Sequence, residues 1–146
     1  MLRSIVGVIV GYAVIFVFFF AIFTGAYFAL GVERIFQPDS YEVSTLWMVL
    51  SAVLSLCGSI LGGYICAAIS KSKATCRVFA GIVLIILILF CIPKMRDEGP
   101  HVRAGEVSNM DAMRLIQMPI WMHLLNPVLA AVGVLLGARM KLRPTE

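Results

Sequence analysis

The chain has 146 residues, of which 61% are hydrophobic and only 14% are charged. A soluble domain carries roughly 45–50% apolar and about 25% charged residues, so this composition excludes an ordinary soluble domain. The formal net charge of +4 comes from the segments between and around the apolar runs, and it therefore requires no nucleic-acid partner.

Four apolar stretches predict an all-α integral membrane four-helix bundle that forms a single transmembrane domain over residues 1–146. A bilayer core about 30 Å thick needs roughly 17–25 helical residues. No Lys, Arg, Asp or Glu lies in the apolar core of any stretch. The predicted spans are residues 4–30, 45–70, 75–93 and 119–138, with outer loops at residues 31–44 and 94–118.

The first span begins with Met-Leu-Arg, as a secretory signal peptide would. The apolar region of a signal peptide has only about 7–15 residues, whereas this run is far longer, so we expect a retained span. Gly7 and Gly11 form a G-x-x-x-G pair, a spacing that lets two helix backbones approach closely. We therefore predict that the first span packs through these two glycines.

The second span carries the strongest pattern in the chain. Before it, Asp39 and Glu42 have the spacing of a capping box, which predicts that the helix begins inside the loop. Within it, small residues recur at steps of three and four and so share one helical face. The predicted packing residues on that face are Ser55, Gly58, Ser59, Gly62, Gly63 and Ala67. Because helices in lipid associate through close backbone approach, we expect this to be the central helix.

The third and fourth spans differ in their small-residue content. The run Ile82–Phe90 contains no small residue, so we expect the third span at the periphery. In the fourth span, Gly133 and Gly137 share a packing face with His123 and Asn126. We predict that these two polar side chains form an interhelical hydrogen-bond cluster beside the kink that Pro127 causes, together with a serine of the second span.

A weak repeat links the second and fourth spans, since Gly63…Lys71 and Gly133…Lys141 have matching spacings. The first and third spans do not resemble each other. Duplication of a helical hairpin is therefore not the favoured interpretation.

The distribution of charge predicts the orientation. The N-terminus, the loop at residues 71–77 and the C-terminus carry seven basic residues and one acidic residue, a net charge of +6. The two other loops carry five basic and seven acidic residues, a net charge of −2. Under the positive-inside rule, both termini are cytoplasmic, the helices form two antiparallel hairpins, and Trp47 and Trp121 lie at the outer interface.

Three segments resemble small, uncharacterised bacterial four-span membrane proteins. They are Gly11-Tyr12 in the first span, Phe36-Gln-Pro-Asp-Ser-Tyr41 before the second, and Gly62-Gly-Tyr-Ile-Cys-Ala-Ala-Ile69 at its exit. The resemblance covers roughly the first half of the chain. It implies an inner (plasma) membrane location and no known activity, so it assigns no functional residue.

Candidate chemistry is sparse. A row of serines, Ser51, Ser55 and Ser59, suits either helix packing or the lining of a pore, and packing is favoured. His123 lies near Met118 and Met122, with Met95, Met110 and Met113 in the adjoining loop, a set that would suit Cu(I). Methionine is also a common filler of apolar contacts, so we expect no metal and no cofactor.

Enzymatic activity is not expected either. Ser108, Asp111 and His101 share the second outer loop, but no catalytic motif surrounds them. Cys57, Cys66, Cys76 and Cys91 form no C-x-x-C motif, which argues against a thiol oxidoreductase or a zinc site.

The sequence therefore favours a non-catalytic multi-pass membrane protein that acts as an accessory, assembly or structural subunit. Its partners would be the lipid bilayer and either a second copy or a larger membrane protein. The alternative is a minimal oligomeric channel or an uncoupled transporter for a small solute. A proton-coupled antiporter is disfavoured, because the apolar core of each span lacks an acidic residue.

Overall fold

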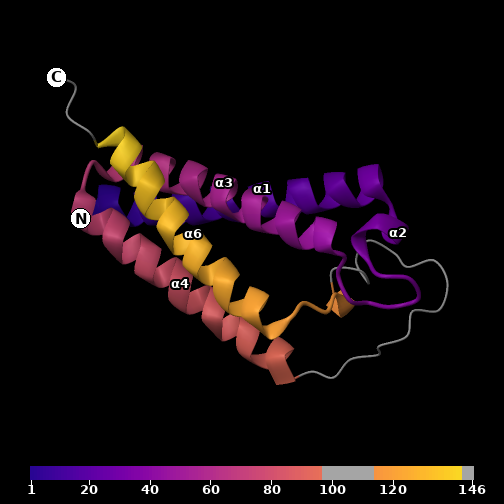
Figure 1. Ribbon diagram of the computed structural model, residues 1–146. Coiled ribbons are helices and arrows are strands. Elements are labelled where there is room, and N and C mark those ends of the chain that lie inside the picture. Colours follow the sequence, from indigo (N-terminus) through magenta and orange to yellow (C-terminus); the bar gives the residue numbers. More distant parts are fainter. Residues whose placement is uncertain (97–113, 143–146) are drawn as a thin grey trace.

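The computed structural model describes residues 1–96 and 114–142, and this part of the chain is helical without any strand. Its helices are α1 (Leu2–Leu30), α2 (Val32–Ile35), α3 (Thr45–Ser70), α4 (Lys73–Arg96) and α6 (Ile120–Lys141) (Figure 1). Isolated bridges join Phe36 to Val43 and Glu42 to Gln117.

Four of these helices are long and apolar enough to cross a membrane. They are α1, α3, the Lys73–Pro93 part of α4, and α6, with 29, 26, 21 and 22 residues. At 1.5 Å per residue, each reaches about 30 Å or more, the thickness of a bilayer core. The fold is therefore all-α and compatible with a multi-pass membrane protein, as the apolar runs predict.

Helix α3 begins later than the capping-box pattern predicts. Its N-cap is Ser44, whose hydroxyl accepts a hydrogen bond from the N–H of Trp47 at 3.2 Å. Asp39 instead adopts a left-handed conformation in a turn, with φ of 53°. The N–H of Glu42 donates to the hydroxyl of Ser40 at 3.0 Å. The predicted cap is therefore wrong, because the turn and the bridge between Phe36 and Val43 hold this segment in a non-helical conformation.

Helices α3 and α6 form the centre of the bundle. Their mutual contact is the most extensive of any helix pair, followed by that of α1 with α3 and that of α4 with α6. Helices α1 and α4 therefore flank a central pair (Figure 1). The core that these helices enclose includes Ile15, Cys66, Ala67, Phe79, Val83, Ala130 and Val134.

Helix α4 is only partly peripheral, which corrects the expectation from its aliphatic run. Along that run, Ile85, Leu89 and Phe90 are exposed, as expected for side chains that face lipid. The first half of the helix contributes buried core residues, which are Cys76, Phe79, Ala80 and Val83. Cys76, Phe79 and Ala80 precede the run, and only Val83 belongs to it. The ring of Phe79 fits beside Gly11, where α1 has no side chain, and this contact brings the first half of α4 into the core.

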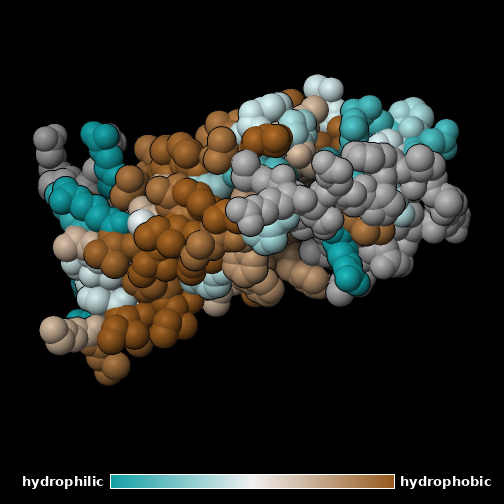
Figure 2. All heavy atoms as spheres, turned by 90° about the horizontal axis from the view of Figure 1, so that it is seen from below, coloured by the Kyte–Doolittle hydropathy of each residue, from teal (hydrophilic) through white to brown (hydrophobic). Residues whose placement is uncertain are grey.

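The two ends of the bundle differ in charge. At one end lie the N-terminus, the turn between α3 and α4, and the end of α6 (Figure 1). The hydroxyl of Thr75 donates to that of Ser4 at 3.1 Å and joins the first two of these segments. We call this the basic end, and its basic residues are Arg3, Lys71, Lys73, Arg77, Arg139 and Lys141. Figure 2 shows an apolar band over the helices that gives way to hydrophilic residues at the left-hand end.

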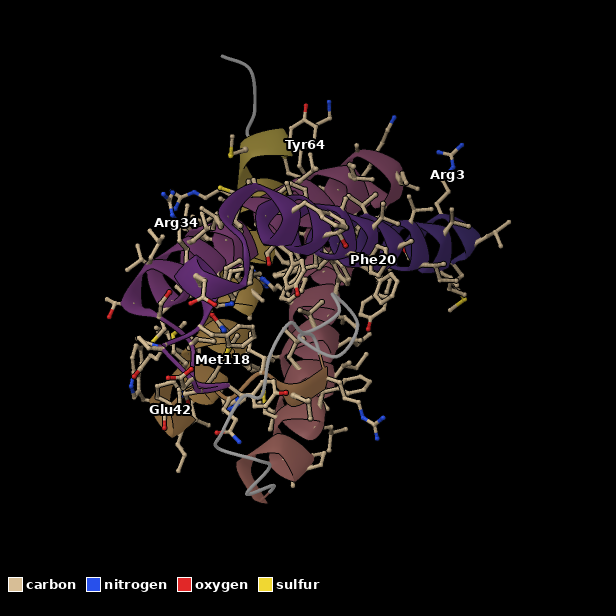
Figure 3. All side chains as sticks on the ribbon, turned by 90° about the vertical axis from the view of Figure 1, so that its right-hand side faces the viewer. Arg3, Phe20, Arg34, Glu42, Tyr64 and Met118 are labelled. Carbon is tan, nitrogen blue, oxygen red and sulfur yellow. The ribbon has the colours of Figure 1, made fainter. Side chains whose placement is uncertain are left out.

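At the opposite end, which we call the loop end, Arg34 of α2, Glu42 and Met118 lie on the same side of the bundle (Figure 3). A second buried cluster lies there and comprises Tyr27, Ile35, Phe36, Tyr41, Val43 and Trp47. The N–H of Gln117 donates to the carbonyl oxygen of Tyr41 at 3.0 Å, and the N–H of Val43 donates to that of Gln117 at 3.1 Å. These bonds tie the segment before α6 to the segment before α3.

Candidate functional site

Helices α3 and α6 meet backbone to backbone at two glycines. A methyl group on Gly63 would overlap the carbonyl group of Val134, and one on Gly137 would overlap the carbonyl group of Ile60. The two contacts are reciprocal, because each helix presents a glycine to a backbone carbonyl of the other. In lipid, such close approach is a main source of helix association. The crossing therefore requires glycine at both positions.

Ser59 and Gly133 lie next to this crossing. A Cβ on Gly133 would lie 2.7 Å from the Cβ of Ser59 and 3.0 Å from the carbonyl oxygen of Leu56. Ser59 is fully buried, and its hydroxyl donates to the carbonyl oxygen of Ser55 at 2.6 Å. Ser59 therefore contributes its small size to the interface, while its hydroxyl bonds within its own helix.

Helix α1 packs on the adjacent face of α3, along Gly62 and Cys66, through the G-x-x-x-G pair. A Cβ on Gly11 would lie 3.0 Å from the carbonyl oxygen of Gly62, and a Cβ on Gly62 would lie 2.9 Å from that of Gly11. One turn earlier, a Cβ on Gly7 would lie 3.1 Å from the carbonyl oxygen of Cys66. Gly7 and Gly11 thus let α1 approach the backbone of α3 closely.

All ten residues that the sequence assigns to helix packing are buried. They are Gly7, Gly11, Ser55, Gly58, Ser59, Gly62, Gly63, Ala67, Gly133 and Gly137. Their surroundings differ, however. Gly58 faces the ring of Phe18, whose Cδ1 would lie 2.6 Å from an added Cβ, whereas Gly63 and Gly137 face backbone atoms.

An apolar cavity of ≈ 450 Å³ lies among α1, α3, α4 and α6. Aromatic and aliphatic side chains from all four helices line it, among them Phe18, Phe23, Leu87 and Phe90. Small-molecule sites have volumes of about 300–1,000 Å³, so the cavity has the size for an apolar ligand or an alkyl chain. The sequence gives no sign of this cavity, because its wall combines residues from four separate spans.

Two polar atoms at this cavity have no hydrogen-bond partner among the residues that the structure describes. They are Nε1 of Trp47 and Oδ1 of Asn126, both fully buried. Trp47 is only 3% exposed, and its ring packs edge-on against that of Phe23, with the ring centroids 5.1 Å apart. Trp47 thus packs inside the bundle, in the first turn of α3, whereas Trp121 is 56% exposed.

Asn126 does not complete the predicted polar cluster with His123. No residue in the described part of the chain bonds its carbonyl oxygen. The hydroxyls of Ser51 and Ser59, the candidate partners on α3, donate to the carbonyl oxygens of Met48 and Ser55. Serine readily forms such bonds within its own helix, and this competing bond explains the difference from the expectation.

The serine row does not line a polar path within the described bundle. Ser55 and Ser59 are buried, and Ser51 and Ser55 face the apolar cavity. The hydroxyl of Ser51 donates a hydrogen bond to the carbonyl oxygen of Met48 at 3.0 Å, and that of Ser59 donates to the carbonyl oxygen of Ser55 at 2.6 Å. The arrangement favours packing over water passage through a single chain.

Metal ligands do not gather in the described ranges, 1–96 and 114–142, where no group of three His, Cys, Asp or Glu could hold an ion. Cys66 and Cys76 are buried, Cys91 is half-buried and Cys57 is exposed, and all four are free thiols. Met122 is buried and Met118 half-buried. The outer-loop candidates His101, Ser108, Met110, Asp111 and Met113 lie outside the described residues, as does most of the loop.

Comparison of this chain with protein-family models, with curated proteins and with solved structures finds no match.

Proposed function

We propose that this chain is a non-catalytic multi-pass membrane protein that acts as an accessory or assembly subunit. The observation that carries this proposal is the close packing of α1, α3 and α6 through glycines. Such packing forms a scaffold whose helices are held backbone to backbone rather than around a reaction centre.

The outward surface supports the same proposal. Helix α1 packs mainly against α3, and its other faces leave aromatic side chains exposed, among them Phe16, Phe20 and Phe28. Such a surface suits lipid, and it also suits the helix of a larger membrane protein, because aromatic side chains offer large contact areas. We propose that this aromatic face of α1 contacts the partner.

The orientation and the arrangement of the spans form part of the proposal. The basic end carries six described Lys and Arg residues, whereas the loop segments contain Glu33, Asp39 and Glu42. The positive-inside rule then assigns the basic end to the cytoplasm. In this arrangement, α1–α3 and α4–α6 are two antiparallel hairpins with cytoplasmic termini in the inner membrane.

The channel or transporter alternative has less support. A hydrophilic solute needs a polar path, but the apolar cavity has few polar groups and the serine hydroxyls of α3 bond within their own helix. The apolar cores of the spans also contain no charged side chain for ion coupling.

Purification of the full-length chain from its native membrane in mild detergent, followed by mass spectrometry, tests the subunit role. We expect a membrane protein to co-purify in a fixed ratio with wild type. Recovery of the partner should fall for Phe16→Ala/Phe20→Ala but not for Ile85→Ala/Leu89→Ala, a matched pair of exposed apolar residues on α4.

Two results would contradict the proposal. One is a chain that purifies alone while its function in the membrane is intact. The other is a continuous water-accessible path in a cysteine-accessibility scan of α3, which would favour the channel alternative.

A further inference from the structure

A second cavity, of ≈ 390 Å³, opens at the basic end between the start of α4 and the end of α6. Three of its lining side chains are cationic, namely Lys73 and Arg77 from α4 and Arg139 from α6. None of the residues that line it, all from the described part of the chain, is acidic. The wall of this cavity therefore contains three positively charged side chains, and no carboxylate among its lining residues neutralises them.

This concentration of like charge favours binding of an anion, because an anion between the cations would remove their mutual repulsion. The backbone at the start of α4 offers few donors. The N–H of Thr75 donates to the hydroxyl of Ser72 at 3.3 Å, and that of Cys76 donates to the carbonyl oxygen of Ser72 at 3.2 Å. The side chains must therefore supply the donors, and the planar guanidinium groups of Arg77 and Arg139 suit phosphate oxygens.

The rest of the wall is apolar. Leu135, Ala138 and Leu142 line the cavity from α6 and the residue that follows it, and Leu135 is 43% exposed. The cavity thus has a cationic part and an apolar part. Figure 2 shows that an apolar band adjoins the hydrophilic residues at this end of the bundle. A free phosphate ion would contact only the charged part of this wall, whereas a phospholipid would cover both parts.

We propose that this cavity binds an anionic glycerophospholipid, with its phosphate between Arg77 and Arg139 and an acyl chain along Leu135. Basic pockets between membrane helices are a known means of binding anionic headgroups. The site is separate from the apolar cavity, and its occupancy does not depend on the accessory role proposed above.

The test is a lipid titration of the full-length chain in a neutral detergent, with thermal unfolding as the readout. Phosphatidylglycerol should raise the melting temperature of wild type more than phosphatidylcholine does. Arg77→Gln/Arg139→Gln should lower the affinity for phosphatidylglycerol about 30-fold, from roughly a factor of five for each basic side chain. Arg3→Gln/Lys71→Gln is the matched control, because it removes two charges from the same end without altering the cavity wall.

The proposal is supported if only the cavity variant loses the preference for phosphatidylglycerol. It is overturned if both double variants lose that preference equally, since the effect would then be general attraction to the basic end. Equal stabilisation of wild type by the two lipids would also overturn it. Stabilisation by inorganic phosphate as strong as that by phosphatidylglycerol would show that the ligand is not a lipid.

Discussion

Gly63 and Gly137 make reciprocal contacts across the α3–α6 crossing. Each glycine lies against the carbonyl group of a residue in the opposite helix, three positions before that helix's own glycine. Gly63 faces Val134, and Gly137 faces Ile60. Gly133 lies against Leu56 and Ser59, and Gly137, one turn later in α6, lies against Ile60 and Tyr64, one turn later in α3. The two helices therefore run side by side in the same chain direction.

Gly63→Ala and Gly137→Ala should each destabilise the bundle. The added methyl group meets backbone atoms, which cannot change rotamer, so the two helices must move apart. Overpacking of this kind costs about 1–3 kcal/mol or more. Thermal unfolding in detergent, followed by circular dichroism, should show a lower melting temperature for both variants.

The control for this prediction is Gly81→Ala on α4, where an added Cβ has no neighbour within 4 Å. Since alanine favours helix over glycine by up to about 1 kcal/mol, this variant should match or exceed the stability of wild type. A loss as large as that of Gly63→Ala would show that the effect is not specific to the crossing.

Gly58→Ala should destabilise the bundle, and a second substitution, Phe18→Leu, should partly restore its stability. The three atoms nearest to the added methyl group would all belong to the ring of Phe18, with Cδ1 at 2.6 Å. Replacement of that ring in Gly58→Ala/Phe18→Leu should restore part of the melting temperature, giving a coupling of about 0.5–3 kcal/mol in a double-mutant cycle. Additive losses would mean that the two residues do not meet.

The matched comparison is Gly63→Ala/Val134→Ala. Because Gly63 faces the main chain of Val134, truncation of the valine side chain should restore nothing. Recovery in this pair would contradict the backbone contact at the crossing.

Asn126→Leu should leave the stability unchanged or raise it. The buried Oδ1 of Asn126 has no partner among the described residues, and an unsatisfied buried polar group costs about 1–3 kcal/mol. Leucine has a similar size and suits the apolar wall of the cavity. Asn126→Ala should instead lower the melting temperature, because it enlarges the cavity. A larger loss for leucine than for alanine would show that the amide has a partner.

Alkaline phosphatase fusions should report the orientation. A fusion after Gly105 should be active, and a fusion after Arg143 should be inactive, because the basic end is expected in the cytoplasm. Removal of the positive charge at the basic end through Lys71→Gln/Lys73→Gln should weaken this asymmetry. The opposite activity pattern would reverse the proposed topology.

The sequence by itself determined the four long helices and the small-residue face of the second span. Length and hydropathy suffice for the first, because a helix must contain enough apolar residues to match a bilayer core. Helical periodicity suffices for the second, because residues at steps of three and four share one face. Gly7 and Gly63 could therefore be singled out before any contact was known.

Only the tertiary structure decided which backbone each glycine meets and where the bundle leaves space. The contacts of Gly63 with Val134 and of Gly11 with Phe79 depend on the register and tilt of separate helices, which no local pattern specifies. The same holds for the buried position of Trp47 and for the two cavities, whose walls combine residues from different spans. A hydroxyl such as that of Ser59 can bond within its own helix or to a neighbour, and only the packing around it decides between the two.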